Sequence, residues 1–127
     1  MKSYSQMCPI ALGLDRIGDR WTLLIVRELM IRKDLRFTDL QDGLPGIASN
    51  LLTSRLDNLL ELGIIERALT GHGKTQPIYN LTELGQELGP AVLAIAKWGA
   101  QFLDKKLKNF EYREHWSDFA RKNKLIA

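Results

Sequence analysis

The segment from Ala48 to Leu62, ASNLLTSRLDNLLEL, constrains the fold of this chain more than any other stretch. At 3.6 residues per turn, an α-helix places the leucines of this segment on one face: Leu52, Leu56, Leu59 and Leu60. The opposite face carries Asn50, Ser54, Asp57 and Glu61. The pattern predicts an amphipathic helix with one buried face and one open face.

The open face carries side chains suited to reading DNA. Short hydrogen-bonding groups, small enough to bring a helix against base edges, occupy the first two turns: Ser49, Asn50, Thr53 and Ser54. Arg55 flanks them and could reach a phosphate. An ordinary surface helix with a solvated face has the same pattern, so this segment alone leaves both interpretations open.

The preceding residues favour a helix-turn-helix. Cys8-Pro9 opens a predicted helix to residue 17, and Asp19 can cap a second helix over 20–31. A short strand is expected at Arg36-Phe37, and Thr38 can cap a brief third helix. The break at 44–46, LPG, then separates this third helix from the leucine-striped one, which is the order found in DNA-binding helix pairs.

The following residues predict a hairpin and more helices. Gly63 is a plausible stop for the striped helix, and strands are expected at 64–69 and 77–81, joined by the polar tip TGHGKT. Thr82 with Glu83 begins a fifth helix, which Gly89-Pro90 should kink or interrupt. A last helix is expected over 112–125. The predicted class is mainly α with a small β-hairpin wing, a winged helix-turn-helix of the α+β type.

The length of 127 residues with 45% apolar content fits one compact domain. We expect residues 1–103 to form the winged helix-turn-helix with its dimerisation helices, and 104–127 to be a basic helical extension of the same domain. Without a membrane-length apolar run or a signal peptide, a cytoplasmic, non-membrane protein is expected. A single cysteine and two distant histidines predict neither a metal site nor a cofactor.

The net charge of +3 is mildly basic, so any DNA surface must be local. Seven Lys/Arg against four Asp/Glu follow residue 103, including the cluster Lys105, Lys106 and Lys108. Closer to the striped helix, the candidate phosphate anchors are Arg36, Arg55, Arg67 and Lys74. His72 at the hairpin tip is more simply explained as solvated.

Several short motifs follow one another in a recognisable order. They are Cys8-Pro9-Ile10, GDRWTLLI at 18–25, Arg36-Phe37, LPGI at 44–47, Leu52 with Arg55-Leu56 and Leu59, LGII at 62–65 with Arg67, YNLTELG at 79–85, and Trp98-Gly99. Together they resemble the HxlR-type winged helix-turn-helix transcriptional regulators, relatives of the MarR-like group. Each piece alone is weak, but the ordered set spans about residues 8 to 99.

The resemblance implies a homodimer on double-stranded DNA, with the first and fifth helices of two subunits packed together. The apolar excess of these helices agrees with this, and the expected interface residues are Ile10, Leu14, Leu88, Val92, Ile95 and Phe102. A two-fold dimer would read a palindromic operator. A DNA-binding protein of this size would act by occupying a promoter and blocking it, which favours a repressor.

Two positions depart from the family pattern. Ala48 stands where Ser or Thr often caps the recognition helix, so the cap is expected to shift to Ser49. Gly89 adds a second helix-weakening residue beside Pro90.

Cys8 precedes a helix start, where the helix dipole favours a thiolate. Some members of the resembling family respond to oxidants or electrophiles through a cysteine at this position, which implies redox sensing and a small-molecule or electrophile effector. The alternative is an inert free cysteine that acts as a small hydrophobe. Trp21 and Trp98 are expected to be core or interface aromatics, with a ligand pocket as the alternative.

Two other function classes remain to be compared. A winged helix can be a protein-interaction module without DNA binding, and the acidic Asp57 and Glu61 favour this alternative slightly. An enzyme needs a nucleophile with a base or paired carboxylates in a cleft, and the sequence shows no such set. We therefore expect no catalytic activity.

Overall fold

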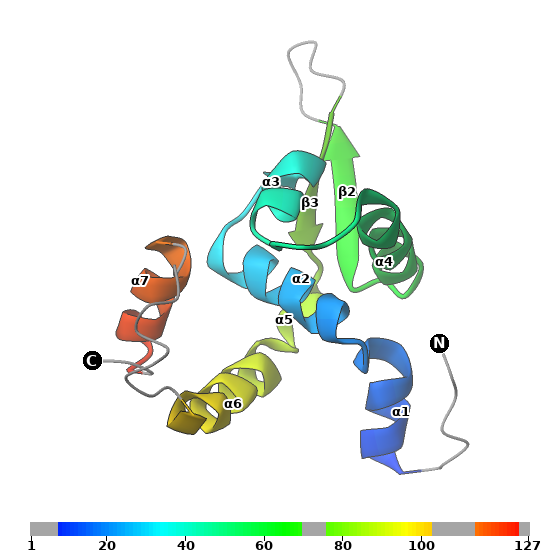
Figure 1. Ribbon diagram of the computed structural model, residues 1–127. Coiled ribbons are helices and arrows are strands. Elements are labelled where there is room, and N and C mark those ends of the chain that lie inside the picture. The colour runs from blue at the N-terminus through cyan, green and yellow to red at the C-terminus, as the bar shows by residue number, and fades with distance from the viewer. Residues whose placement is uncertain (1–7, 70–75, 103–113, 125–127) are drawn as a thin grey trace.

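A computed structural model describes residues 8–69, 76–102 and 114–124 (Figure 1). Its elements, in chain order, are α1 (Pro9–Ile17), α2 (Arg20–Ile31), β1 (Leu35–Arg36), α3 (Phe37–Asp42), α4 (Ser49–Glu61), β2 (Ile65–Leu69), β3 (Pro77–Leu81), α5 (Glu83–Gln86), α6 (Gly89–Gly99), the 3-10 turn η1 (Ala100–Phe102) and α7 (Glu114–Lys122). The predicted winged helix-turn-helix is confirmed: α3 and α4 form the helix pair, and β2 and β3 form the arms of the wing.

The sheet is antiparallel with strand order β1-β3-β2. β3 pairs with β2 in the register Ile65 to Leu81 and Leu69 to Pro77, and with β1 through Leu35 and Tyr79. The short strand expected at Arg36-Phe37 lies one residue earlier, at Leu35–Arg36. Because β1 precedes α3 directly, this pairing attaches the wing to the helix pair.

The core lies where α2, α4 and the sheet meet. Its buried side chains include Ile25, Val26 and Leu29 of α2, Leu40 of α3, Leu52, Leu56 and Leu59 of α4, and Ile65 of β2. Full burial of one such side chain stabilises the fold by about 1.5–3 kcal/mol. In Figure 1, α2 crosses the centre of the molecule, with α3, α4 and the sheet on one side and α6 on the other.

The N-terminal cap of α2 follows the sequence prediction, and that of α3 does not. The Asp19 carboxylate caps α2 by accepting the backbone N–H groups of Trp21 and Thr22 at 2.8 and 3.2 Å. The expected cap of α3 by Thr38 is wrong, because α3 begins at Phe37 with Arg36 as N-cap. Asp39 replaces it: its carboxylate accepts the Arg36 backbone N–H at 2.9 Å, a bond that lowers the pKa of Asp39.

The start of α4 also corrects the sequence prediction. Ala48, not Ser49, is the N-cap residue, with extended backbone angles and no side-chain capping bond. Ser49 is already helical, and its hydroxyl oxygen accepts a hydrogen bond from the Gln41 side-chain amide at 2.8 Å. Gly63 ends the helix as expected, because it follows the C-cap with φ of 74°, a conformation that favours glycine.

The expected fifth helix is interrupted at Gly89-Pro90, as predicted, and forms α5 and α6. The Thr82 hydroxyl caps α5 by accepting the Gly85 N–H at 3.1 Å. The last predicted helix, over 112–125, corresponds to α7 within the described residues, and positions 112, 113 and 125 lie outside them. Over the part of the chain that the structure describes, no helix has the length and apolar character needed to cross a membrane.

Candidate nucleic-acid interface

The predicted reading face of α4 is open in the structure. Leu52, Leu56 and Leu59 are buried beneath the helix, whereas Ser49, Asn50, Thr53 and Ser54 are exposed. Two of these polar groups already have partners: Ser49 accepts from Gln41, and the Thr53 hydroxyl donates to the Ser49 carbonyl oxygen at 3.0 Å. The side chains of Asn50 and Ser54 make no hydrogen bond with another described residue, so their polar groups are free to bond a ligand.

Arg55 has a second role that the sequence did not indicate. Its guanidinium lies 3.0 Å from the carboxylate of Asp19, the residue that caps α2. Burial alone would raise the pKa of Asp19, but the hydrogen bonds from Arg55 and from the α2 N–H groups outweigh it and lower that pKa. Arg55 therefore fastens α4 to the start of α2, and its side chain is only 29% exposed.

The other predicted phosphate anchors come from the strands. Arg36, at the end of β1, is half exposed and forms an ion pair with Asp39 at 3.3 Å. Arg67 is exposed on β2, opposite Tyr79 of β3. Lys74 and His72 lie outside the described residues, as do Lys105, Lys106 and Lys108. Arg36 and Arg67 are therefore the described candidates with accessible charge beside the helix pair.

The predicted dimer residues divide into two groups. Ile10, Leu14, Ile95 and Phe102 are exposed, with 75% of Ile10 accessible to solvent. Leu88 and Val92, by contrast, are half buried and pack against the core of their own subunit. Trp98 joins the exposed group and contacts Phe102 edge-to-face, with ring centroids 5.1 Å apart. Trp21 packs against the core, as expected of a structural aromatic.

Cys8 occupies the N-cap position of α1 and is exposed. Its sulfur accepts the backbone N–H of Ala11, with an N···S distance of 3.3 Å. The thiol therefore lies at a helix N-terminus, as the sequence predicted, and it is also accessible. Within the described residues, no three His, Cys, Asp or Glu side chains gather in a way that could hold a metal ion.

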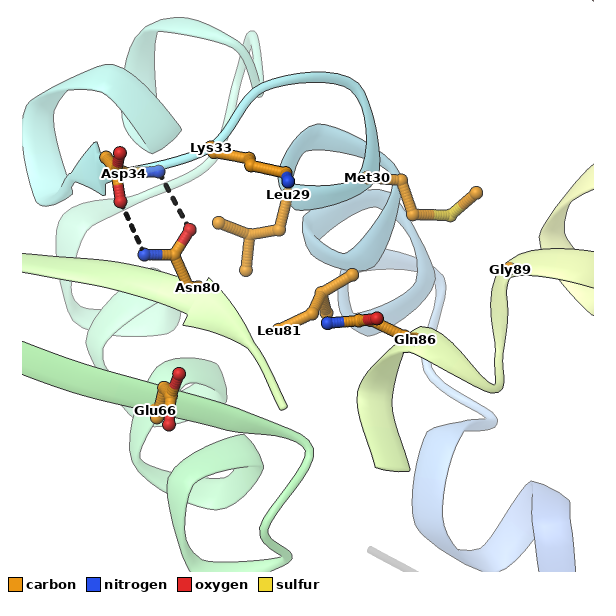
Figure 2. A pocket seen from close by; sticks show the side chains of 9 residues that line it. All are labelled: Leu29, Met30, Lys33, Asp34, Glu66, Asn80, Leu81, Gln86 and Gly89. Atoms are coloured by element: carbon orange, nitrogen blue, oxygen red, sulfur yellow. Dashed lines mark hydrogen bonds between the residues drawn. The ribbon is translucent and has the colours of Figure 1, made fainter. Parts of the chain in front are cut away.

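A cleft of about 470 Å³ separates the base of the wing from α2 and α6 (Figure 2). Its polar lining consists of Lys33, Asp34, Glu66, Asn80 and Gln86, and its apolar lining of Leu29, Met30 and Leu81, with Gly89 at one edge. Asp34 and Asn80 bridge the turn after α2 to β3: the Asp34 N–H donates to the Asn80 amide oxygen at 2.8 Å, and the Asn80 amide donates back to the carboxylate at 2.7 Å. The cleft thus lies between the wing and α6, one of the helices expected at the dimer interface.

Sequence reasoning also missed Glu28, a charged residue of α2 that is fully buried. It contacts Arg27, Arg32, His115 and Trp116. Burial lowers the pKa of the Arg27 guanidinium, and the Glu28 charge acts in the opposite direction. The only available signal was a lone acidic residue within the apolar stretch RWTLLIVRELM, because its partners on α7 follow more than 80 positions later.

Comparisons with known proteins agree with this geometry. The family model described as HxlR-like helix-turn-helix matches residues 16–107. The uncharacterised HTH-type transcriptional regulator sll1512 of Synechocystis sp. is 34% identical over 100 residues, covering 79% of this chain and 73% of the relative. YvaP of Bacillus subtilis, described in the same terms, is 31% identical over 101 residues, covering 79% and 93%.

Solved structures show the same fold. PA1607, described as a candidate transcription factor, superposes with a TM-score of 0.73 at 35% identity, covering 86% of this chain and 73% of its own. The redox regulator HypR in its oxidised form gives 0.70 at 31% identity, with coverage of 76% and 99%. The quinone-bound YodB from B. subtilis gives 0.63 at 32%, with coverage of 76% and 100%.

Proposed function

The chain belongs to the HxlR-like helix-turn-helix family of transcriptional regulators, and from this premise we propose that it is a homodimeric repressor that binds a palindromic operator. The observation that carries the proposal is the exposed polar face on the first two turns of α4. Asn50 and Ser54 present uncommitted hydrogen-bonding groups there, and short side chains of this kind bring a helix close to base edges in the major groove.

The anchoring role falls to cations around this face. Arg36 and Arg67 are exposed beside the helix pair and would bond phosphates, which fixes the register of the reader without specifying sequence. Lys74 would act in the same way from the wing. Arg55 would contribute mainly by holding α4 against α2 through Asp19, and only secondarily by phosphate contact.

Dimerisation would bury the exposed apolar side chains of α1 and α6 with η1. Ile10, Ile95, Trp98 and Phe102 are each more than half exposed, and large exposed apolar side chains of this kind mark interaction surfaces. A two-fold dimer presents two copies of α4 to two identical half-sites, which is why a palindrome is expected. We include residues 104–127 in the same domain as an extension of it.

An effector would act through Cys8. The solved relatives include a redox regulator in its oxidised form and a regulator with bound quinone. Cys8 is exposed at a helix N-terminus, beside the proposed dimer surface of α1. Oxidation or adduct formation there would change how two subunits pack, and with it the spacing of the two readers.

The second candidate function is a protein-interaction module without DNA binding. Asp57 and Glu61 are exposed on the outer face of α4 and would repel phosphates. They lie on the C-terminal half of the helix, however, whereas base contacts come mostly from the N-terminal half. The relatives are transcriptional regulators, and we propose no catalytic activity.

The proposal is tested by selecting duplexes from a random-sequence pool with the wild-type protein. The enriched duplex is then measured against a scrambled one for Asn50→Ala and Ser54→Ala, with Glu61→Gln as the control on the same helix. We expect each alanine variant to lose about 1–3 kcal/mol of binding free energy on the enriched duplex and none on the scrambled one. Failure to enrich any duplex would favour the protein-interaction module.

A further inference from the structure

Glu28 is a buried carboxylate at the junction of α2, α3 and α7, with none of its surface accessible to solvent. A carboxylate removed from water is costly unless it is paired and hydrogen-bonded. The Arg27 and Arg32 guanidinium groups lie 3.4 and 3.7 Å from its two oxygens. The Trp116 indole N–H donates to it at 2.9 Å, and the His115 Nε2 lies 2.8 Å away.

Half of these partners come from α7. Trp116 also packs its ring against the Arg27 guanidinium, whose carbon lies 4.1 Å from the ring centroid. These contacts seat α7 beside α2, on the side of the molecule away from α1 (Figure 1). Residues 114–124 lie beyond the stretch that the family model matches, which ends at 107.

The other two partners reach the helix pair. Arg27 donates to the Gly43 carbonyl oxygen at 3.2 Å, and Arg32 donates to the Asp39 carbonyl oxygen at 3.4 Å. Gly43 ends α3 and is packed against Glu28 so closely that a Cβ there would collide with the carboxylate. The same carboxylate therefore touches both α7 and the turn that leads into α4.

The link continues to the reader. Gln41, near the end of α3, donates to the hydroxyl of Ser49 in the first turn of α4 at 2.8 Å. Leu44, which follows Gly43, is buried in the core. A displacement of the turn would therefore be transmitted to the first turn of α4, where Asn50 stands.

We propose that α7 is an intramolecular clamp on the DNA reader, and that Glu28 is the positioning residue through which it acts. With α7 seated, four partners hold the carboxylate, and the two arginines are fixed on α3 and on the turn before α4. With α7 released, the Glu28 carboxylate loses its two hydrogen-bond donors from α7 and becomes accessible to water. Arg27 and Arg32 are then no longer held in place. The proposal rests on the proposed function, because its consequence is higher operator affinity in the clamped state.

The test uses the full-length protein with single substitutions in α7, so that the core side chains of α2 and α4 are not altered. Trp116→Ala removes the ring and the donor, and His115→Ala removes the second polar partner. His115→Gln is the conservative rescue, because its amide nitrogen has about the reach of Nε2. Asp118→Asn is the matched control, since Asp118 is exposed and, among the described residues, bonds only Arg121 on the same helix.

Two quantities are measured for each variant. The first is amide hydrogen exchange over residues 39–49 in the free protein, compared with exchange over the rest of the chain. The second is affinity for the duplex that the wild type enriches from a random pool, compared with a scrambled duplex. Losing a hydrogen bond to a charged group should shift the equilibrium between seated and released α7 toward the released state roughly tenfold or more.

We expect both alanine variants to exchange faster over 39–49 and to bind the enriched duplex several-fold to tenfold more weakly, while His115→Gln and Asp118→Asn stay near the wild type. Wild-type affinity in Trp116→Ala would overturn the clamp. So would faster exchange that is uniform along the chain, which indicates general destabilisation. If the wild type enriches no duplex, the proposed function fails, and unchanged exchange over 39–49 would separately refute the link from α7.

Discussion

Replacing Asp19 tests whether one carboxylate both starts α2 and fastens α4. In the structure it accepts two backbone N–H groups of α2 and pairs with Arg55 of α4 at 3.0 Å. Loss of an N-cap costs about 0.5–2 kcal/mol. A partly screened ion pair adds up to about 1 kcal/mol, since the two side chains keep 24% and 29% of their surface exposed. Asp19→Ala should therefore lower the free energy of unfolding by about 1–3 kcal/mol.

The two contributions are separated by a conservative variant and a double-mutant cycle. Asp19→Asn keeps the capping oxygen and loses the charge, so it should cost less than Asp19→Ala. The cycle of Asp19→Asn with Arg55→Met, measured by urea unfolding at one fixed protein concentration, should give a coupling energy of about 0.5–1 kcal/mol. A coupling energy of zero, with the full loss confined to Asp19→Ala, would refute the role of Arg55 as the fastening of α4.

The dimer, the cysteine and pH give further tests. In sedimentation at micromolar concentration, Ile95→Asp should turn the proposed dimer into a monomer, because it would bury an unpaired charge, and Lys97→Ala on the same helix should leave the mass unchanged. Equal masses for both variants would exclude α6 from the proposed interface. Diamide should alter binding of the enriched duplex by the wild type but not by Cys8→Ser, and non-reducing electrophoresis separates an intersubunit disulfide from a mixed adduct; equal responses would retire Cys8 as a sensor. Because the pKa values of Asp19 and Asp39 are lowered in the folded state, the stability that these carboxylates contribute is complete at neutral pH and is lost as the pH falls below about 4. The free energy of unfolding of Asp19→Asn should therefore depend less on pH over this range. An unchanged pH dependence would contradict the lowered pKa of Asp19.

The leucine stripe of α4, the capping aspartate of α2 and the break before Pro90 could be predicted because each depends on residues close together in the sequence. Helical periodicity and local capping chemistry act within a few positions, so one sequence is enough to place them. The predicted cap of α3 was wrong because the helix already begins at Phe37, where the Asp39 carboxylate accepts the N–H of the N-cap residue Arg36.

The contacts that the sequence could not predict join distant parts of the chain. Arg55 pairs with Asp19, 36 positions away in the sequence, and Glu28 contacts His115, 87 positions away. Nothing in the local pattern distinguishes Arg55 from a free surface arginine. Likewise, the half burial of Leu88 and Val92 depends on how α5 and α6 turn back onto α2, which periodicity alone does not determine.

The most direct test of the central claim is the ratio of affinities for the enriched and scrambled duplexes in the triple variant Asn50→Ala, Thr53→Ala, Ser54→Ala. If α4 reads bases, this ratio should fall toward one while binding to the scrambled duplex is retained, because the proposed phosphate contacts of Arg36 and Arg67 would remain. Footprints of the wild type should show two half-sites about 34–36 Å apart or at a multiple of that spacing. A triple variant that keeps the wild-type ratio would contradict the claim that this helix is the reader.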